Sequence, residues 1–130
     1  LYRKSGLLGI SGTSSDMQTL ISAADTDSAA AEAIELFVYQ LTKHLGSMIA
    51  VLGGLDTLVF TGGIGEHAPT IRAAACERLG YLGLHLDVTA NEGNQRVIST
   101  PQSSVTVLVV PTDENLMIAR HTLKLLGQSL

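Results

Sequence analysis

Hydrophobic residues recur at helical spacing over the longest patterned stretch of the chain. The repeating positions are Ile34, Val38, Leu41, Leu45, Met48 and Leu52. They follow one another at alternating intervals of four and three residues, which places their side chains along one face of a helix. Residues 25–28 (DTDS) offer N-cap side chains before this stretch, and Gly53 and Gly54 offer a C-terminal stop. We therefore expect one long helix that ends near residue 52.

Two runs of β-favouring residues follow this helix. Residues 57–60 (TLVF) and 105–110 (VTVLVV) are rich in β-branched and aromatic side chains, which predicts buried strands. The segment 61–66 (TGGIGE) comes directly after the first run, and Pro69 is typical of the first turn of a further helix. The glycines are therefore expected in a turn between a strand and a helix.

The remaining patterns are weaker. In chain order they predict a loop or short strand over 5–15, a short helix over 16–24, an edge strand over 84–87, a polar turn over 91–94, a strand over 96–99 and a helix over 112–127. Helices and strands that alternate in this way predict an α/β fold with helices on both faces of a mixed sheet.

Composition narrows the class of protein. A length of 130 residues with 45% apolar content fits one domain over 1–130. A net charge of -4 with only 15% charged residues argues against a nucleic-acid partner. The chain has neither a membrane-spanning apolar run nor a signal-peptide pattern, so we expect a cytoplasmic protein without a membrane partner. Cys76 is the only cysteine and is expected to be a buried thiol.

The glycine segment is the first candidate for chemistry. Gly62, Gly63 and Gly65 have no Cβ, so backbone amides at a helix start could approach a phosphate or sugar closely. The spacing matches neither the dinucleotide fingerprint nor the P-loop, because no lysine follows the glycines. From spacing alone, a nucleotide-binding loop and a tight structural turn both stay open.

Three segments taken together resemble the acetate kinase family. They read LLGISGTSSDM, LVFTGGIGEH and VVPTDENLMIA, and they stand in the family's order and approximate spacing. The family's glycine segment reads FTGGIGEN, and here residues 60–67 read FTGGIGEH. The resemblance covers nearly the whole chain.

This resemblance implies a fold and a domain arrangement. Acetate kinases belong to the sugar kinase, heat-shock ATPase and actin superfamily, of ribonuclease H-like type, in which two domains close on a nucleotide. The chain resembles the C-terminal, nucleotide-binding domain. It opens at Leu1 rather than at a methionine, so we expect a fragment that lacks the N-terminal domain and is inactive by itself.

The resemblance also implies a set of nucleotide-binding residues. Carried over by position, the residues that line the ATP site are Asp16, Met17, Gln18, Gly63, Ile64, Gly65, Glu66 and His67. Gln18 stands where the family has an arginine, and His67 stands where it has an asparagine. An amide attracts phosphate oxygens far less than a guanidinium does, so we expect weaker nucleotide binding. The structural alternatives are that Asp16 only caps a helix, that Met17 packs in the core and that His67 is a solvated loop side chain.

Magnesium is implied at one further residue. Glu114 matches the family's magnesium-associated glutamate, and a hard cation bridging phosphates needs oxygen ligands. The alternative is structural, because Asp113 and Glu114 would both be favoured by the dipole of a helix that starts at residue 112.

The function that the resemblance implies is phosphoryl transfer between ATP and acetate, which yields ADP and acetyl phosphate. A propionate kinase and a noncatalytic nucleotide-binding or dimerisation module are the alternatives. The family forms homodimers through its C-terminal domains, so the seam from Ile34 to Leu52 could belong either to the core or to a dimer interface.

Overall fold

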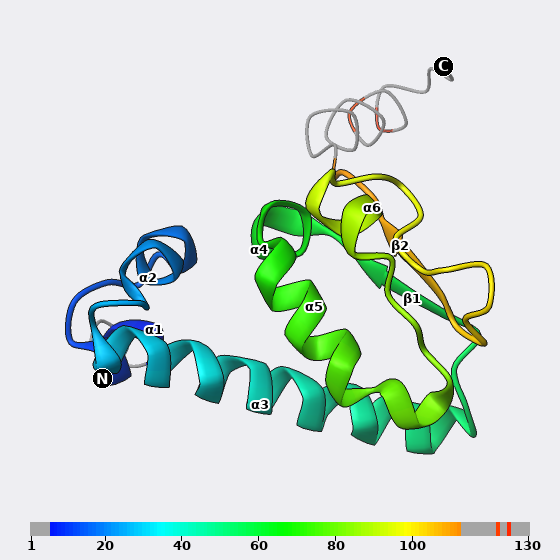
Figure 1. Ribbon diagram of the computed structural model, residues 1–130, viewed down its shortest axis with the longest axis horizontal. Helices are drawn as coiled ribbons and strands as arrows, with labels where there is room; N and C mark the ends of the chain where they lie inside the picture. Colours follow the sequence, from blue (N-terminus) through cyan, green and yellow to red (C-terminus); the bar gives the residue numbers. More distant parts are fainter. Residues whose placement is uncertain (1–5, 113–121, 123–124, 126–130) are drawn as a thin grey trace.

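The fold is α/β, with helices packed against a small parallel sheet (Figure 1). The computed structural model describes residues 6–112, 122 and 125. The elements run in the order α1 (Leu7–Ser11), α2 (Met17–Ala23), α3 (Ser28–Leu52), β1 (Thr57–Phe60), α4 (Gly62–His67), α5 (Pro69–Arg78), η2 (Gly80–Leu82), α6 (Val88–Glu92) and β2 (Thr106–Val109). Within this described part, no helix combines the length and apolar content needed to cross a bilayer. The helix expected over 112–127 lies outside the described residues, apart from single positions.

The long helix α3 is confirmed together with both of its ends. Asp27 caps it, because its Oδ1 atom accepts hydrogen bonds from the backbone amides of Ala29 and Ala30 at 2.9 and 3.3 Å. Gly53 ends it in the left-handed conformation, with φ of 76°, which glycine adopts without a steric penalty. Helices α1, α2 and α5 all pack against α3, so it is the element that joins the two ends of the molecule (Figure 1).

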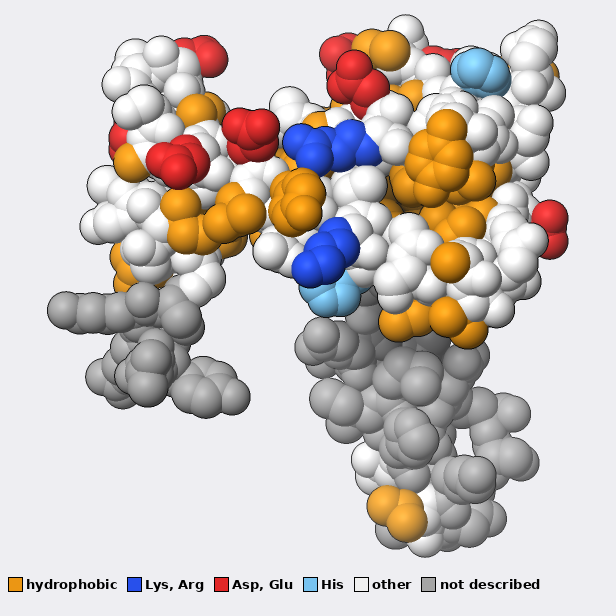
Figure 2. Space-filling view, turned by 90° about the horizontal axis from the view of Figure 1, so that it is seen from below, with side chains coloured by type: hydrophobic (Ala, Val, Ile, Leu, Met, Phe, Trp, Pro, Cys, Tyr) orange, Lys and Arg blue, Asp and Glu red, His pale blue; other side chains and the backbone are white. Residues whose placement is uncertain are grey.

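The apolar seam of α3 divides between core and surface. Its core positions are Ile34, Val38, Leu41 and Leu45. Beyond them, Ile49 is buried, whereas Met48 and Leu52 are 60% and 73% exposed. A repeat of three and four residues drifts around a straight helix by about 20° per heptad, so the sheet-facing position passes from Met48 to Ile49. Figure 2 looks onto this side of the molecule, where hydrophobic side chains gather towards the C-terminal end of α3.

The two strands pair in parallel and bury one face. Leu58 lies opposite Val107 and Phe60 opposite Val109, and all four side chains are buried. Together with residues of α3 and α5 they form the largest core cluster. On the other face, Val59 is 48% exposed. Helices α3 and α5 therefore cover the face of the sheet that carries Leu58 and Phe60.

The same core cluster contains Cys76, which is 1% exposed as expected for a structural thiol. Burial raises the pKa of this thiol to about 11, so it is protonated and unreactive at neutral pH.

Four local predictions were wrong. Segment 5–15 contains helix α1 instead of a loop or short strand, because Leu7 packs against α2 and α3 and Gly12 ends the helix with φ of 68°. The strands expected over 84–87 and 96–99 are reduced to isolated antiparallel bridges, which pair Leu86 with Ser99 and Val97 with Leu108. The polar turn over 91–94 instead begins inside α6, which Asp87 caps by accepting a hydrogen bond from the amide of Ala90 at 2.9 Å.

The glycine segment also differs from its expected form. It is a short helix, α4, which one residue, Thr61, separates from β1, and it is not an open turn. A Cβ atom at Gly65 would lie 3.3 Å from the carbonyl carbon of Phe60. Gly65 therefore allows α4 to fold back tightly against the end of β1.

Candidate functional site

Two segments that are distant in the sequence meet around one cavity. Its lining residues are Ser15, Asp16, Met17 and Gln18 at the start of α2, and Gly63, Ile64 and His67 on α4. Its volume is about 370 Å³, which lies within the range of small-molecule sites. The structure thus brings together six of the eight residues that the sequence assigns to nucleotide binding. Gly65 and Glu66 are not among those that line it.

Asp16 has a structural role that is compatible with lining this cavity. Its Oδ2 atom accepts hydrogen bonds from the hydroxyl and the backbone amide of Thr19, at 2.7 and 2.9 Å, and so caps α2. These hydrogen bonds lower the pKa of Asp16 below its ordinary value. The carboxylate is therefore ionised at neutral pH and offers a hydrogen-bond acceptor at the edge of the cavity.

Met17 and Gln18 are placed differently from each other. Met17 is only 4% exposed and packs with Val38 and Ile71 in the second core cluster, so it forms the apolar floor of the cavity. Gln18 is exposed, and its Nε2 atom donates a hydrogen bond to the backbone carbonyl of His67 at 2.6 Å. This bond ties α2 directly to the C-terminal end of α4.

The glycines of α4 have different environments. A Cβ atom at Gly63 would meet no atom within 4 Å, so the space beside this residue is open. Gly62 has a φ of 72°, in the left-handed region that glycine favours. Gly63 is thus the glycine at which a ligand could approach the backbone, whereas Gly65 serves packing against Phe60.

Glu66 turns away from this cavity and joins the ends of the two strands. Its Oε1 atom accepts hydrogen bonds from the backbone amides of Gly62 and Thr112, both at 2.8 Å, and from the Thr112 hydroxyl at 2.9 Å. The bonds from Thr112 are the main reason that the pKa of Glu66 is lowered. Its side chain holds the loop after β2, and a place for Glu66 in the ATP site stays a prediction.

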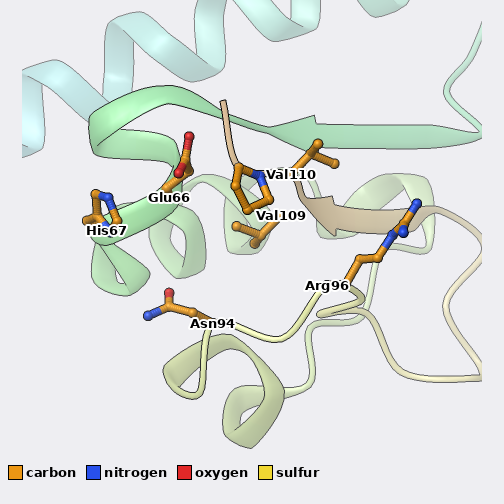
Figure 3. A pocket seen from close by; sticks show the side chains of 7 residues that line it. Glu66, His67, Asn94, Arg96, Val109 and Val110 are labelled. Carbon is orange, nitrogen blue, oxygen red and sulfur yellow. The ribbon is translucent and has the colours of Figure 1, made fainter. Parts of the chain in front are cut away.

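A second cavity lies beside the C-terminal end of α4 and the end of β2 (Figure 3). It has a volume of about 390 Å³, and its lining residues are Glu66, His67, Asn94, Arg96, Val109, Val110 and Pro111. His67 lines both cavities. The C-terminal end of α4 is therefore the wall between them.

The described residues contain no group of three or more His, Cys, Asp or Glu side chains that could hold a metal ion. Glu114, the magnesium residue that the sequence implies, lies outside the described residues, as does Asp113. Thr112, which Glu66 holds, is the residue that immediately precedes them.

Comparison with known proteins decides the family. The model of the acetokinase family matches residues 1–120. The chain belongs to the acetokinase family. It is 58% identical to an acetate kinase of Rhodopseudomonas palustris (strain TIE-1) over 128 residues, which cover 96% of this chain and 31% of that relative. The chain thus spans about a third of the length of the curated relatives it matches.

Solved structures from the same family have the same fold. The structure of Porphyromonas gingivalis acetate kinase matches with a TM-score of 0.85 at 43% identity, covering 95% of this chain and 32% of that one. A propionate kinase from Francisella tularensis matches with a TM-score of 0.81 at 41% identity, covering 89% of this chain and 30% of that one.

Family membership gives the contact between Gln18 and His67 a particular meaning. These are the two positions at which the sequence resemblance leads us to expect a departure from the family's motifs. They are 49 residues apart in sequence, and the amide of one is bonded to the carbonyl of the other. The two departures therefore belong to one local structure.

Sequence reasoning missed one residue that supports the wall of this candidate site. Arg72 on α5 is completely buried and donates hydrogen bonds to the carbonyls of Gly65 and Glu66, at 2.9 and 2.8 Å. The sequence signal that could have revealed Arg72 is its position between Ile71 and three alanines, in a stretch expected to face the core. Such a residue is rarely fully buried unless its N–H groups are all paired.

Proposed function

We propose that this chain is the nucleotide-binding part of an acetate kinase, which transfers a phosphoryl group between ATP and acetate to give ADP and acetyl phosphate. The observation that carries the proposal is the cavity between α2 and α4. Residues 16–18 and the α4 residues Gly63, Ile64 and His67 are separated by more than forty positions, yet both groups line it. They are the two segments that the family resemblance assigns to ATP.

The domain arrangement is part of the same proposal. We propose that residues 1–130 form the C-terminal domain of a two-domain kinase of the sugar kinase, heat-shock ATPase and actin type. The position of the cavity supports this, because α4 follows the carboxyl end of a parallel strand, where ligands of α/β proteins bind. The acetate pocket and the groups that act on the transferring phosphoryl would then come from other parts of the complete enzyme.

The residues around the cavity suit the neutral part of a nucleotide. Met17 and Ile64 provide apolar surface for a base. The ionised carboxylate of Asp16 would accept hydrogen bonds from ribose hydroxyl groups, and it would repel phosphates. Gln18 uses one of the two N–H groups of its amide on His67, and the remaining N–H belongs to an uncharged group, so Gln18 adds little attraction for phosphate oxygens. We infer that this chain binds nucleotide more weakly than a relative with an arginine at position 18.

Magnesium remains a proposal that rests on Glu114. Magnesium in phosphoryl-transfer enzymes is held by one or two carboxylates together with the substrate's phosphates and water. When bound, it would neutralise the charge on the transferring phosphate. The role of the described residues is to hold the chain before Glu114, through the bonds from Thr112 to Glu66.

The proposal is tested by filling the cavity with a side chain. Gly63→Leu places that side chain into the open space beside Gly63, and Gly46→Leu on α3 is the matched control, because a Cβ atom there also meets no atom within 4 Å. We expect isothermal titration calorimetry to show ATP and adenosine binding by the parent and by Gly46→Leu. Gly63→Leu should lose about tenfold or more in affinity, since it removes the volume that the base occupies. Equal affinities for all three proteins would refute the nucleotide site.

Propionate is the alternative acyl acceptor, and the match to a propionate kinase structure supports keeping it. Turnover of acetate and propionate by the full-length protein, at saturating ATP, distinguishes the two. A higher kcat/KM for propionate would overturn the acetate assignment. Nucleotide binding without turnover of either acid would instead support a noncatalytic binding module.

We also propose a homodimer in the cytoplasm. The exposed side chains of Met48, Val51 and Leu52 at the end of α3 support the dimer, because they are 60%, 83% and 73% exposed and adjacent on one helix. Replacing Met48 with lysine should convert the dimer to monomer in light scattering. A parent protein that is already monomeric would remove this part of the proposal, and cell fractionation tests the location.

A further inference from the structure

All N–H groups of the buried Arg72 guanidinium are paired. Nη1 donates to the carbonyl oxygens of Gly65 and Glu66 on α4. Nε donates to Asn91 Oδ1 at 2.8 Å, and Nη2 donates to Asn91 O at 2.7 Å and to Asn94 Oδ1 at 2.6 Å. A guanidinium has five N–H donors. Arg72 uses all five to join α4 to α6 and to the turn after α6.

The acceptors of these bonds are all neutral. They are backbone carbonyls and side-chain amides, so within the described residues the charge of Arg72 is balanced by dipoles and not by a carboxylate. Burying a guanidinium in this way is costly, and an apolar side chain could fill the same space more favourably. The fixed, planar set of donors is what an apolar side chain or a lysine could not supply.

What Arg72 holds is a helix with little stability of its own. Helix α4 has six residues, of which Gly62, Gly63 and Gly65 are glycines. Short glycine-rich helices are unstable in isolation, because glycine loses much backbone entropy and a single turn does not repay nucleation.

The C-terminal carbonyls of α4 depend on groups outside the helix. Ile64 O accepts from the amide of Ala68, Gly65 O and Glu66 O accept from Arg72, and His67 O accepts from Gln18. Arg72 therefore satisfies two of the four carbonyls that the end of a helix leaves without internal partners.

We propose that Arg72 is a positioning residue for the nucleotide site, acting through α4. Its five hydrogen bonds go to Gly65, Glu66, Asn91 and Asn94, so it fixes the carbonyls that lie between Ile64 and His67, two residues of the cavity wall. The inference rests on the proposed function and adds to it the group that keeps the wall preformed. A preformed wall raises affinity because the bound ligand does not have to order it.

The test combines binding with local hydrogen exchange in the full-length protein. Arg72→Lys keeps the charge and removes the planar donor set, and Arg78→Lys, at the exposed end of the same helix, is the matched control. In Arg72→Lys we expect the amides of residues 62–67 to exchange about tenfold faster without nucleotide, while those of α3 are unchanged. We also expect the dissociation constants of ATP and adenosine to rise together by about tenfold, because the wall and not the phosphate is affected.

A milder variant keeps the test decisive if Arg72→Lys does not fold. Asn94→Gly removes one exposed acceptor and tolerates the positive φ of 49° found at this position. It should show the same two effects at about threefold, since one of five bonds is lost. Unchanged dissociation constants in a folded variant, or faster exchange spread equally over α3, would overturn the positioning role. Failure of the unmodified protein to bind either ligand would overturn the proposed function as well.

Discussion

The side-chain amide of Gln18 and the backbone carbonyl of His67 are joined by a hydrogen bond of 2.6 Å across the candidate nucleotide cavity. The bond connects the first turn of α2 to the last residue of α4. It also uses one of the two N–H groups of the Gln18 amide, so only the other is available to a ligand. The geometry of the cavity and its affinity for charged groups are therefore coupled at this contact.

Replacing Gln18 with arginine should strengthen ATP binding. A guanidinium can still donate to His67 O and adds a permanent charge with further donors, so we expect the ATP dissociation constant to fall by about five- to tenfold. Adenosine binding should change little, because it lacks phosphates. Calorimetry with both ligands measures this. Thr26→Arg, which adds the same charge at an exposed position beyond α2, is the control, and an equal gain there would show that only net charge matters.

Glu66 should make the stability of the protein depend on pH in the acidic range. Its pKa lies below the ordinary value of 4.5 because Thr112 and Gly62 donate hydrogen bonds to the carboxylate. Its contribution to stability is therefore complete above pH 4.5 and is lost as the pH falls through the lower, folded-state pKa. The melting temperature of Glu66→Gln should lie below that of the parent at pH 7, and the gap should narrow towards pH 3. A constant gap would contradict this, and Glu77→Gln at an exposed site of α5 is the control.

Gly65→Val should destabilise the protein through packing. Its Cβ atom would lie 3.3 Å from the backbone of Phe60, so α4 or β1 has to move. Overpacking of this kind costs about 1–3 kcal/mol. Denaturant unfolding measures the free energy of unfolding, and Gly80→Val, where a Cβ atom meets nothing within 4 Å, should cost much less. Equal losses would mean that the contact with Phe60 is not the cause.

Alanine substitutions at two neighbouring residues of α3 should lower the free energy of unfolding by very different amounts. Ile49 is 8% exposed in the core cluster, so Ile49→Ala should lower the free energy of unfolding by about 2–4 kcal/mol. Met48 is 60% exposed, so Met48→Ala should lower it by about 0.5 kcal/mol or less in the monomer. Urea unfolding at low protein concentration makes the comparison. A large effect at Met48 that grows with protein concentration would locate the residue in a dimer interface.

Features set by local patterns could be predicted from the sequence. The 25-residue helix α3 was predictable because Asp27 caps it, Gly53 stops it and the residues between them keep a helical repeat. The strands β1 and β2 were predictable because their β-branched and aromatic residues are contiguous. The motif resemblance also indicated which residues near Asp16 and Gly63 would lie close together, although they are far apart in sequence.

The short helices and the roles of the polar residues were decided by the tertiary structure. Helices α1, α4 and α6 have five or six residues each, and elements of that length are stable only when other parts of the chain pack against them. Whether Glu66 faces a ligand or holds Thr112, and whether Arg72 lies in solvent or braces α4, depends on atoms from distant segments. The sequence by itself determined the long helix α3, the two strands and the protein family. Only the folded chain determined which side chains form its walls and which hold those walls in place, because hydrogen bonds of this kind exist only once distant backbone groups are brought within reach.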